Sequence, residues 1–269
     1  MAPEAKVTAA TLRARKGTGE RVAVLTAYDV VFARLADGAG IDAVLVGDSL
    51  GMVVQGERST LGVTLDEMVY HSRIAARGIT RAHLIADMPF MSYQASVEDG
   101  MRSAGRLMKE GHAEAVKLEG GVEVAELCRR LVRAGIPVMG HVGLTPQSVH
   151  QLGGFKVQGR TDAQRSQILE DARALSDAGA YAIVLEAIPH ALAGEITRAV
   201  PALTIGIGAG ADCDGQVMVM HDLLGLQPSW KPRFVRRYAE MGKGAGEAFA
   251  AYAADVRAGT FPAAEETYE

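Results

Sequence analysis

Residues 83–119, HLIADMPFMSYQASVEDGMRSAGRLMKEGHAEAVKLE, contain the pattern that decides the fold. The apolar runs at the two ends, 83–87 and 115–119, have the length and composition of buried strands. The sequence between them is long enough and amphipathic enough to form a helix. A strand, a helix and a second strand in this order are typical of one unit of a parallel sheet.

The same alternation of short apolar runs and longer amphipathic stretches continues along the whole chain. We expect eight strands, at residues 22–27, 43–47, 83–87, 115–119, 137–141, 182–186, 203–207 and 216–220. This count predicts an α/β protein with the (β/α)8 TIM-barrel fold, and 269 residues suit one barrel of about 250. An open, doubly wound sheet is the alternative that the same alternation allows, but the strand count favours the barrel.

Signals for the ends of helices fall between these strands. Thr64 with Glu67 forms a capping box, Ser96 with Asp99 is a similar helix start, and Asp29 is a plausible N-cap. Four glycines follow apolar-periodic segments, where a left-handed helix stop would be placed: Gly38, Gly78, Gly111 and Gly135.

The chain has no low-complexity linker, so we expect residues 1–269 to form a single barrel domain. Residues 1–20 are expected to form a short helix that closes the bottom of the barrel. The tail from about Lys231 onward is expected to form one or two amphipathic C-terminal helices.

The composition limits the function classes. With 48% hydrophobic and 22% charged residues the chain suits a soluble globular protein, and a net charge of −4 argues against a nucleic-acid partner. No run of 18 apolar residues is present, so no membrane span is expected. The N-terminus lacks a signal-peptide pattern, and Cys128 and Cys213 are interpreted as reduced thiols. These features predict a cytoplasmic protein.

Polar side chains stand at the carboxyl ends of five predicted strands: Asp48, Asp87, Glu119, His141 and Glu186. In a barrel these ends meet at one mouth, where active sites of this fold lie. Any one of these residues alone is more simply interpreted as a helix cap or turn former. Five at one mouth favour an active site.

Strand periodicity adds Lys117 to this set. Side chains alternate between faces, so Lys117 and Glu119 share one face of their strand, while Val116 and Leu118 share the other. The apolar pair is expected to pack against the outer helices, which directs Lys117 and Glu119 into the barrel. A structural ion pair is the alternative, but the position at the mouth favours a function.

The number of acidic residues at the mouth predicts a cation. Like charges that share a site raise one another's pKa unless something neutralises them, and carboxylates suit Mg²⁺. Asp48, Asp87 and Glu119 come from consecutive strands and are the predicted metal ligands, some of them through water. Glu186 lies two strands further round and is predicted to act as a general base.

Three further segments have weaker interpretations. IGIGAG, at residues 205–210, resembles an anion-binding loop but comes too late in the chain for a dinucleotide fingerprint, so we expect it to shape the mouth. GLTPQS, at residues 143–148, has Thr145 and Pro146 in N-cap and N1 order and predicts a helix start. Residues 49–64 are long for a βα connection and could form a lid or substrate loop.

Several motifs resemble one known family, that of ketopantoate hydroxymethyltransferase. The resemblance covers residues 22–262 in the family's order and includes LTAYD, LVGDSLGMVVQG, STLGVTLDEMVYH, ADMPFMSY, AVKLEGG, GHVGLTPQSVHQLGGFKVQGR, IVLEAIP, TIGIGAG and DGQVMVMHDLLG. The resemblance implies a barrel of the phosphoenolpyruvate/pyruvate type. It also implies transfer of a one-carbon unit from 5,10-methylenetetrahydrofolate to 3-methyl-2-oxobutanoate, giving 2-dehydropantoate for coenzyme A synthesis.

The resemblance further implies Mg²⁺ as cofactor and a homo-oligomer, commonly a decamer. Its motifs assign the metal to Asp48, Asp87 and Glu119 and the proton acceptor to Glu186. The substrate would contact Asp48, Ser49, Asp87, Lys117 and His141. The departures from the family pattern that we notice, at Gly62 and around Cys213, bear on the folate side.

Two other function classes remain as alternatives. A lyase or mutase on the same barrel would also stabilise an enolate at Mg²⁺, but without folate. It is disfavoured by the full run of motifs and by the absence of the lyases' catalytic-cysteine motif. A non-catalytic binding or scaffold protein would be expected to lose at least one strand-end carboxylate, and this chain has kept them all.

Overall fold

The computed structural model describes residues 5–227 and 232–268. The eight predicted strands are present, each with boundaries within two residues of those expected: β1 (Val22–Thr26), β2 (Ala43–Val46), β3 (His83–Asp87), β4 (Ala115–Glu119), β5 (Val138–Gly143), β6 (Ala182–Glu186), β7 (Leu203–Ile207) and β8 (Gly215–Met218). All neighbours are parallel, and β8 pairs with β1 to close the barrel. The open-sheet alternative is therefore excluded.

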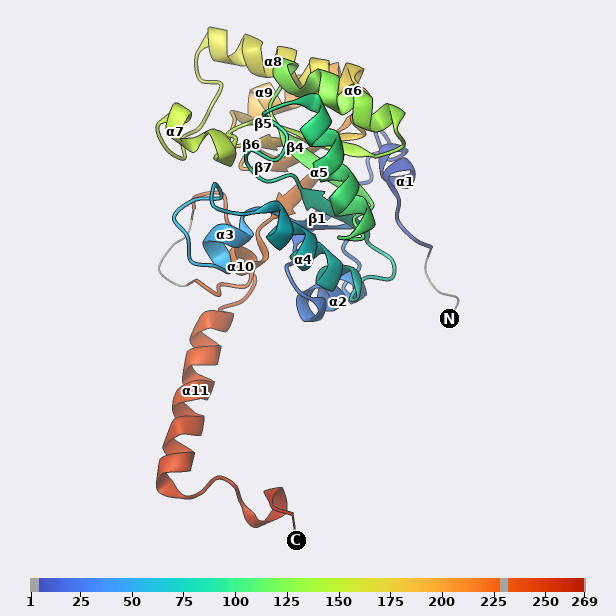
Figure 1. Cartoon of the computed structure of the whole chain (residues 1–269). Helices are drawn as coiled ribbons and strands as arrows, with labels where there is room; N and C mark the ends of the chain where they lie inside the picture. The colour runs from blue at the N-terminus through green and yellow to red at the C-terminus, as the bar shows by residue number, and fades with distance from the viewer. Residues whose placement is uncertain (1–4, 228–231, 269) are drawn as a thin grey trace. The chain divides into compact units, whose positions relative to one another are not determined.

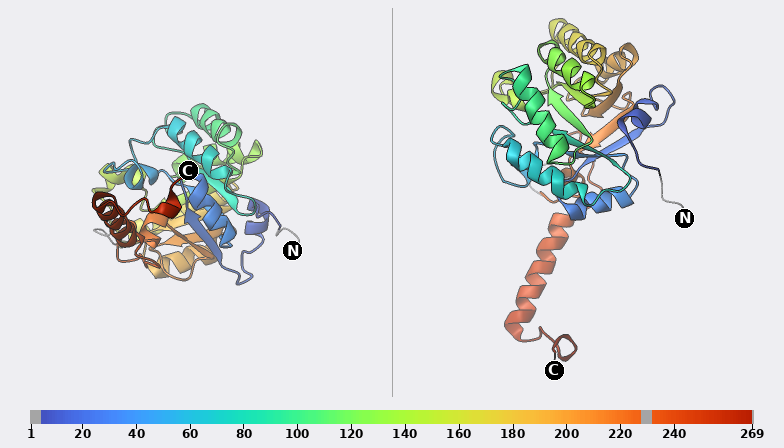
Figure 2. Two further views of the ribbon diagram at one scale, coloured as in Figure 1. Left: turned by 90° about the horizontal axis from the view of Figure 1, so that it is seen from below. Right: turned by 45° about the vertical axis from the view of Figure 1, so that its right-hand side comes forward.

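Helices lie outside the strands, as the views in Figures 1 and 2 show. The elements up to β8 are α1 (Ala9–Arg13), α2 (Val30–Gly38), α3 (Leu50–Val53), α4 (Leu65–Ala76), α5 (Val97–Lys109), η1 (Val122–Val124), α6 (Ala125–Arg133), η2 (Pro146–Ser148), α7 (Val149–Leu152), α8 (Asp162–Asp177) and α9 (His190–Ala199). Each long crossover follows one strand and precedes the next, which is the connection a parallel barrel needs.

The predicted helix starts are confirmed. Asp29 caps α2 by accepting hydrogen bonds from two backbone N–H groups, and Thr64 forms a reciprocal capping box with Glu67 at the start of α4. Ser96 accepts from the N–H of Asp99 at the start of α5. These caps satisfy helix N–H groups that have no partner within the helix, so they fix where each crossover begins.

The predicted glycine stops are mostly wrong. Only Gly135 has a positive φ, at +86°, whereas Gly38, Gly78 and Gly111 do not. The left-handed residue near the end of α2 is Gly40, with φ +82°, and the one near the end of α5 is the non-glycine His112, with φ +58°.

Gly78 and Gly111 serve close packing instead of chain reversal. A Cβ at Gly78 would lie 2.5 Å from the carbonyl oxygen of Val30, and one at Gly111 would lie 2.6 Å from that of Leu107. Both distances are far below a normal contact, so the lack of a side chain lets backbone approach backbone at these points.

The N-terminal segment covers the end of the barrel where the strands begin. The N–H of Val7 donates to the carbonyl oxygen of Arg81, just before β3, and Leu12 in α1 is 1% exposed within the barrel core. The predicted closing helix at this end is therefore confirmed in residues 9–13, while residues 1–4 lie outside the described part.

The interior of the barrel is filled by alternate residues of each strand. Ile85, Ala115, Met139 and Val184 belong to one buried cluster with their counterparts on the other strands. Since side chains two apart share a face, the strands continue this inward-facing row toward their carboxyl ends. The functional residues described below lie on that continuation.

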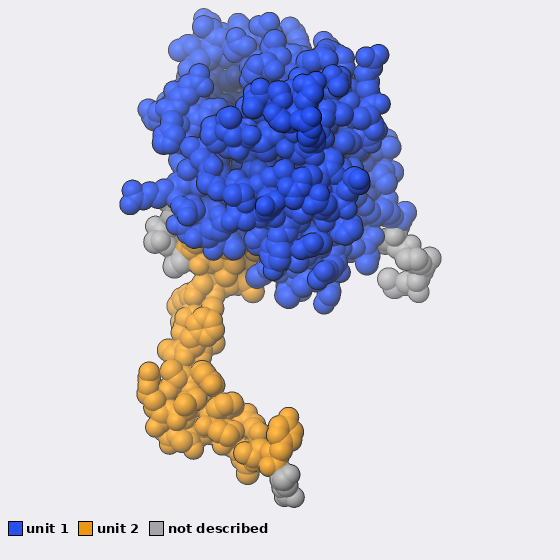
Figure 3. All heavy atoms as spheres, in the orientation of Figure 1, with its two compact units in different colours: residues 1–219 blue, residues 220–269 orange. Residues whose placement is uncertain are grey.

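The chain divides into two compact units, residues 1–219 and residues 220–269, which Figure 3 shows in blue and orange. The first unit holds the barrel; the second holds α10 (Met220–Leu223), α11 (Met241–Ala258) and η3 (Ala264–Glu266). The single-domain expectation stays a prediction. Lys231, where the predicted helical tail begins, lies outside the described residues. Among the described helices, none has both the length and the apolar character needed to cross a bilayer.

Candidate active site

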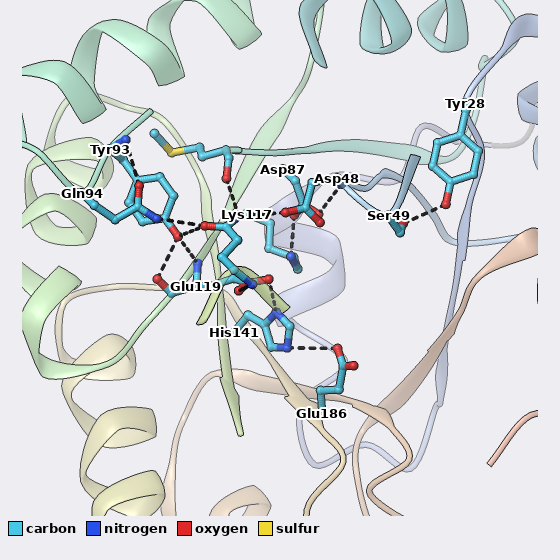
Figure 4. Close-up of polar contacts among 12 residues, drawn as sticks. Tyr28, Asp48, Ser49, Asp87, Tyr93, Gln94, Lys117, Glu119, His141 and Glu186 are labelled. Carbon is cyan, nitrogen blue, oxygen red and sulfur yellow. Dashed lines mark hydrogen bonds and ion pairs between the residues drawn. The ribbon is translucent and has the colours of Figure 1, made fainter. Parts of the chain in front are cut away.

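Strand-end residues from five strands face one another at the mouth of the barrel. Asp87, Glu119 and Glu186 are the last residues of β3, β4 and β6, His141 lies in β5, and Asp48 follows β2 by two residues. Figure 4 shows these side chains grouped together with Lys117. The structure thus brings together the residues that the sequence placed there.

Lys117 and Asp87 form a buried ion pair. Their strands pair Asp87 with Lys117 in register, and Lys117 Nζ lies 2.5 Å from Asp87 Oδ1. Burial by itself would lower the pKa of Lys117, but Asp87 and two further carboxylates outweigh it and raise that pKa. The ammonium group therefore stays charged inside the barrel, as the strand periodicity predicted.

Asp48 lies beside this pair, and its backbone N–H donates to Asp87 Oδ2 at 3.0 Å. Burial raises the pKa of the Asp48 carboxyl well above its usual value, and the charges of Asp87 and Glu119 raise it further. Negative charge is therefore crowded here beyond what Lys117 neutralises, which is the situation a bound cation relieves.

His141 lies between two carboxylates. Its Nδ1 is 3.3 Å from Glu119 Oε1, and its Nε2 is 3.2 Å from Glu186 Oε2. Burial lowers the pKa of His141, but the carboxylates of Glu119 and Glu186 outweigh it and raise it to about 9. The ring is therefore an imidazolium at neutral pH, and it fixes the position of Glu186.

Ser49 begins the long segment that follows β2. Its hydroxyl is 2.8 Å from the hydroxyl of Tyr28, which is buried and lies just after β1. Burial raises the pKa of Tyr28, so this hydroxyl keeps its proton. Part of residues 49–64 forms α3, and Thr60 and Val63 are buried. Whether the segment acts as a lid stays a prediction.

The chemistry of the donor set fits a hard divalent cation. Asp48, Asp87 and Glu119 supply carboxylate oxygens, and the polar contact given for buried Glu119 Oε1 is the ion pair with His141 at 3.3 Å. No three His, Cys, Asp or Glu side chains within residues 5–227 and 232–268 converge as a complete ligand set. A cation here would therefore take one or two of these carboxylates and complete its coordination with water or substrate.

Two residues of the site were missed by the sequence analysis. Gln147 was interpreted only as part of a helix start, and Tyr93 was given no role, although both stand inside motifs quoted above. The Gln147 side chain donates to Asp48 Oδ2 at 2.9 Å and accepts from Tyr93 Oη at 2.8 Å. Gln147 lies in the short 3-10 helix η2 and Tyr93 in the loop after β3. Neither segment has a periodicity that indicates direction, so only the polar type of the two residues was available as a signal.

One pocket lies between the segment before α4, the loop after β3 and α5. It has a volume of about 520 Å³ and is formed by residues 61–65, residues 89–92 and one side of α5. Its two arginines, Arg102 and Arg106, are already paired with acidic side chains. None of the strand-end carboxylates lines it, so the site is defined by its charges and not by this pocket.

Solved structures share the barrel at low sequence identity. A phosphonopyruvate hydrolase, solved in complex with oxalate and Mg²⁺, matches with a TM-score of 0.63 and 13% identity over 96% of this chain and 93% of its own. A 2,3-dimethylmalate lyase, described as a member of the PEP mutase/isocitrate lyase superfamily, gives a TM-score of 0.61 and 19% identity over 99% and 93%. These matches establish the fold type.

Sequence comparison is more specific. The family model described as ketopantoate hydroxymethyltransferase matches residues 6–264. The 3-methyl-2-oxobutanoate hydroxymethyltransferase of Anaeromyxobacter sp. (strain K) is 58% identical over 97% of this chain and 87% of its own. The protein of the same name from Moorella thermoacetica is 54% identical over the full length of both. With its barrel and its strand-end residues, the chain belongs to the ketopantoate hydroxymethyltransferase family.

Proposed function

We propose that this chain is a 3-methyl-2-oxobutanoate hydroxymethyltransferase, which forms 2-dehydropantoate with 5,10-methylenetetrahydrofolate as the one-carbon donor. Relatives at 52–58% identity carry the enzyme's name. The reaction adds a carbon to C3 of the 2-oxo acid, so the site must remove a proton from C3 and stabilise the resulting enolate. Water supplies the hydroxyl oxygen of the product, and tetrahydrofolate leaves as the two C–N bonds to the transferred carbon break.

The observation that most directly supports this mechanism is that the carboxylates differ in their exposure to solvent. The side chain of Glu186 is 17% exposed, whereas those of Asp87 and Glu119 are each 3% exposed. A base must reach its substrate, and a charged group that binds a cation is better held in a dry, fixed position. Glu186 is therefore proposed as the base.

The remaining residues have separate tasks in this mechanism. The imidazolium of His141 holds Glu186 in place, and Lys117 offers a fixed positive charge near the substrate's carboxylate and keto oxygens. A preorganised charge stabilises the negative charge that develops on the enolate oxygen, which is the larger part of the catalytic effect. Asp48, Ser49 and Asp87 complete the proposed substrate contacts.

Mg²⁺ is the proposed cofactor, held by Asp48, Asp87 and Glu119 directly or through water. Such an ion, when bound, polarises a carbonyl group as a Lewis acid. The proposal is supported by the oxygen donor set and by the raised pKa of Asp48, whose causes are burial first and then its acidic neighbours.

Glu186→Gln tests the proposed base. The variant should lose exchange of the C3 proton of 3-methyl-2-oxobutanoate in D2O, because an amide cannot accept that proton, while Mg²⁺ binding measured by calorimetry stays close to wild type. NMR of the substrate gives the exchange rate. Exchange at the wild-type rate would remove Glu186 from the role.

Asp48→Ala and Asp87→Ala test the proposed metal site. Each variant should weaken Mg²⁺ binding and metal-dependent activity by about 10-fold or more, since a direct or water-mediated ligand is lost. Exposed Asp162→Ala in α8 is the control. Normal Mg²⁺ affinity in both site variants would refute the metal cluster.

A lyase or mutase acting without folate is the competing enzyme on this barrel. Product formation that requires 5,10-methylenetetrahydrofolate separates the two, because a lyase would cleave or rearrange the 2-oxo acid alone. We further propose a cytoplasmic homo-oligomer, and sedimentation velocity of the purified protein tests the oligomeric state. The free thiols of Cys128 and Cys213 support the location.

A further inference from the structure

The side-chain amide of Gln147 uses all of its hydrogen-bonding positions inside the site. Nε2 donates to Asp48 Oδ2 and to the carbonyl oxygen of Met88, each at 2.9 Å. Oε1 accepts from Tyr93 Oη at 2.8 Å and from Gln94 Nε2 at 2.9 Å. An amide has two donors and two acceptor positions, so none is left over for a substrate.

The orientation of this amide follows from its partners. The carbonyl oxygen of Met88 can only accept, so the end of the amide beside it is the nitrogen, and the end beside Tyr93 and Gln94 is the oxygen. The other end, with its two N–H groups, must then face Asp48. Gln147 is 6% exposed, so water does not compete freely for these bonds.

The backbone of the same residue holds a second carboxylate. The N–H of Gln147 donates to Glu119 Oε2 at 3.0 Å. One residue, in η2 after β5, therefore fixes carboxylates that come from the ends of β2 and β4. It also ties them to the loop after β3 through Met88.

These bonds distinguish the two oxygens of each carboxylate. Gln147 occupies Oδ2 of Asp48 and Oε2 of Glu119. Within the described residues 5–227 and 232–268, no hydrogen bond is made to Asp48 Oδ1, whereas Glu119 Oε1 lies 3.3 Å from His141 Nδ1. The oxygen of Asp48 that Gln147 leaves open, Oδ1, is the one that a cation or a substrate-linked water could use.

We infer that Gln147 is a positioning residue that fixes the orientation of the Asp48 and Glu119 carboxylates, without touching the substrate itself. This inference rests on the proposed function, because the carboxylates it orients are the proposed metal ligands. A Glu at the same position would place an acceptor against Asp48 and against the Met88 carbonyl, so the amide nitrogen is the part that matters.

Gln147→Met tests the inference, because it keeps the length of the side chain and the backbone N–H but removes all four side-chain bonds. The dissociation constant for Mg²⁺ alone, measured by calorimetry, should rise by about 10-fold or more. The Mg²⁺ concentration that half-saturates C3 proton exchange should rise equally, whereas KM for the 2-oxo acid at saturating Mg²⁺ should change little.

Thr204→Val is the matched control for a lost buried bond. Thr204 is fully buried in β7, and its hydroxyl donates to Asp214 Oδ2 at 3.0 Å, near the start of the strand and away from the mouth. This variant should lower Tm without changing Mg²⁺ affinity. A Gln147→Met protein that loses Tm to a similar extent but binds Mg²⁺ and exchanges protons like wild type would overturn the inference.

Tyr93→Phe covers the case in which Gln147→Met does not fold. It removes one of the two donors to Oε1 and should weaken Mg²⁺ binding in the same direction by a smaller factor; unchanged binding would count against the inference. If wild type catalyses no exchange, the proposed function fails while calorimetry still decides the role of Gln147. If the wild-type protein also binds no Mg²⁺, the proposed function and the inference about Gln147 both fail.

Discussion

At the residue scale, the ion pair of Lys117 and Asp87 is expected to contribute both to the stability of the fold and to catalysis. In Lys117→Met, Asp87 would stay buried without its cation, so the free energy of unfolding should fall by about 3–5 kcal/mol. Urea unfolding followed by circular dichroism measures this change in the metal-free protein. Activity should fall as well, because the fixed positive charge near the enolate oxygen is lost.

The double variant Lys117→Met/Asp87→Asn separates these two effects. Without an unpaired charge in the barrel, much of the stability should return, while activity should stay low because Lys117 and the proposed metal ligand Asp87 are both lost. Full recovery of activity in the double variant would show that Lys117 has only a structural role.

At the residue scale, the sequence predicted the side chains in or directly after the strands and missed Gln147 and Tyr93, which lie further along the connecting segments. The two-residue period directed Lys117 and Glu119 inward, and the burial of both agrees with it. Gln147 reaches the site from η2 and Tyr93 from the loop after β3, and the direction of both side chains depends on how these short segments pack. That packing is a tertiary property, and one sequence without its structure does not contain a pattern for it.

At the element scale, the end of β5 depends on the absence of a side chain at Gly143. Its φ is +96°, and a Cβ there would lie 2.4 Å from the carbonyl oxygen of Glu186 on the neighbouring strand. Gly143→Ala should lower the free energy of unfolding by about 2 kcal/mol or more, from backbone strain and overpacking. It should also reduce activity, because the displaced strand carries the proposed base.

Gly105→Ala in α5 is the control for this prediction. It has no positive φ, and a Cβ there would meet nothing within 4 Å. The alanine should raise the free energy of unfolding by about 0.5–1 kcal/mol, since glycine is unfavourable within a helix. Equal stability of the two variants in chemical denaturation would contradict the reason given for Gly143.

Glycine can either end a helix or allow close packing, and this explains why helix ends were harder to predict than helix starts. A cap such as Thr64 with Glu67 is a local pair of hydrogen bonds, so the sequence contains all of it. Gly78 and Gly111 are needed for close approach to Val30 and Leu107, and for Gly78 that neighbour belongs to another helix. A glycine that ends a helix and a glycine that allows packing look the same in a sequence.

At the scale of the whole molecule, Glu114 at the opposite end of the barrel makes the stability of the fold depend on pH. Glu114 Oε1 is 2.8 Å from Lys6 Nζ, and its Oε2 is 3.3 Å from His83 Nδ1 and accepts from the N–H of Leu84. Burial would raise the pKa of Glu114, but these bonds outweigh it and lower the pKa to about 2. The carboxylate therefore stabilises the fold above its unfolded pKa and loses this effect as pH falls toward 2.

Glu114→Gln should reduce stability at neutral pH and make the loss of stability between about pH 4.5 and pH 2 shallower, because one titrating group is removed from the folded state. Thermal unfolding across this pH range checks the prediction. Glu170→Gln, an exposed position in α8, serves as control, and the same acid profile for both variants would refute the role of Glu114.

At this scale the fold was predictable because it repeats. Eight similar strands and their crossovers give many weak signals that agree, and a boundary error in one strand, such as the late start of β5, does not change the count. Closure between β1 and β8 was inferred only from that count, since no local feature of either strand specifies its distant partner.

The pairing of Val22 with Gly215 places a condition on how this protein is made. As the nascent chain leaves the ribosome, β1 cannot pair with its second neighbour, β8, until the six strands between them have been synthesised. A product truncated before residue 215 would keep two open sheet edges, and such edges recruit other chains into aggregates. Only translation through the last strand removes that hazard.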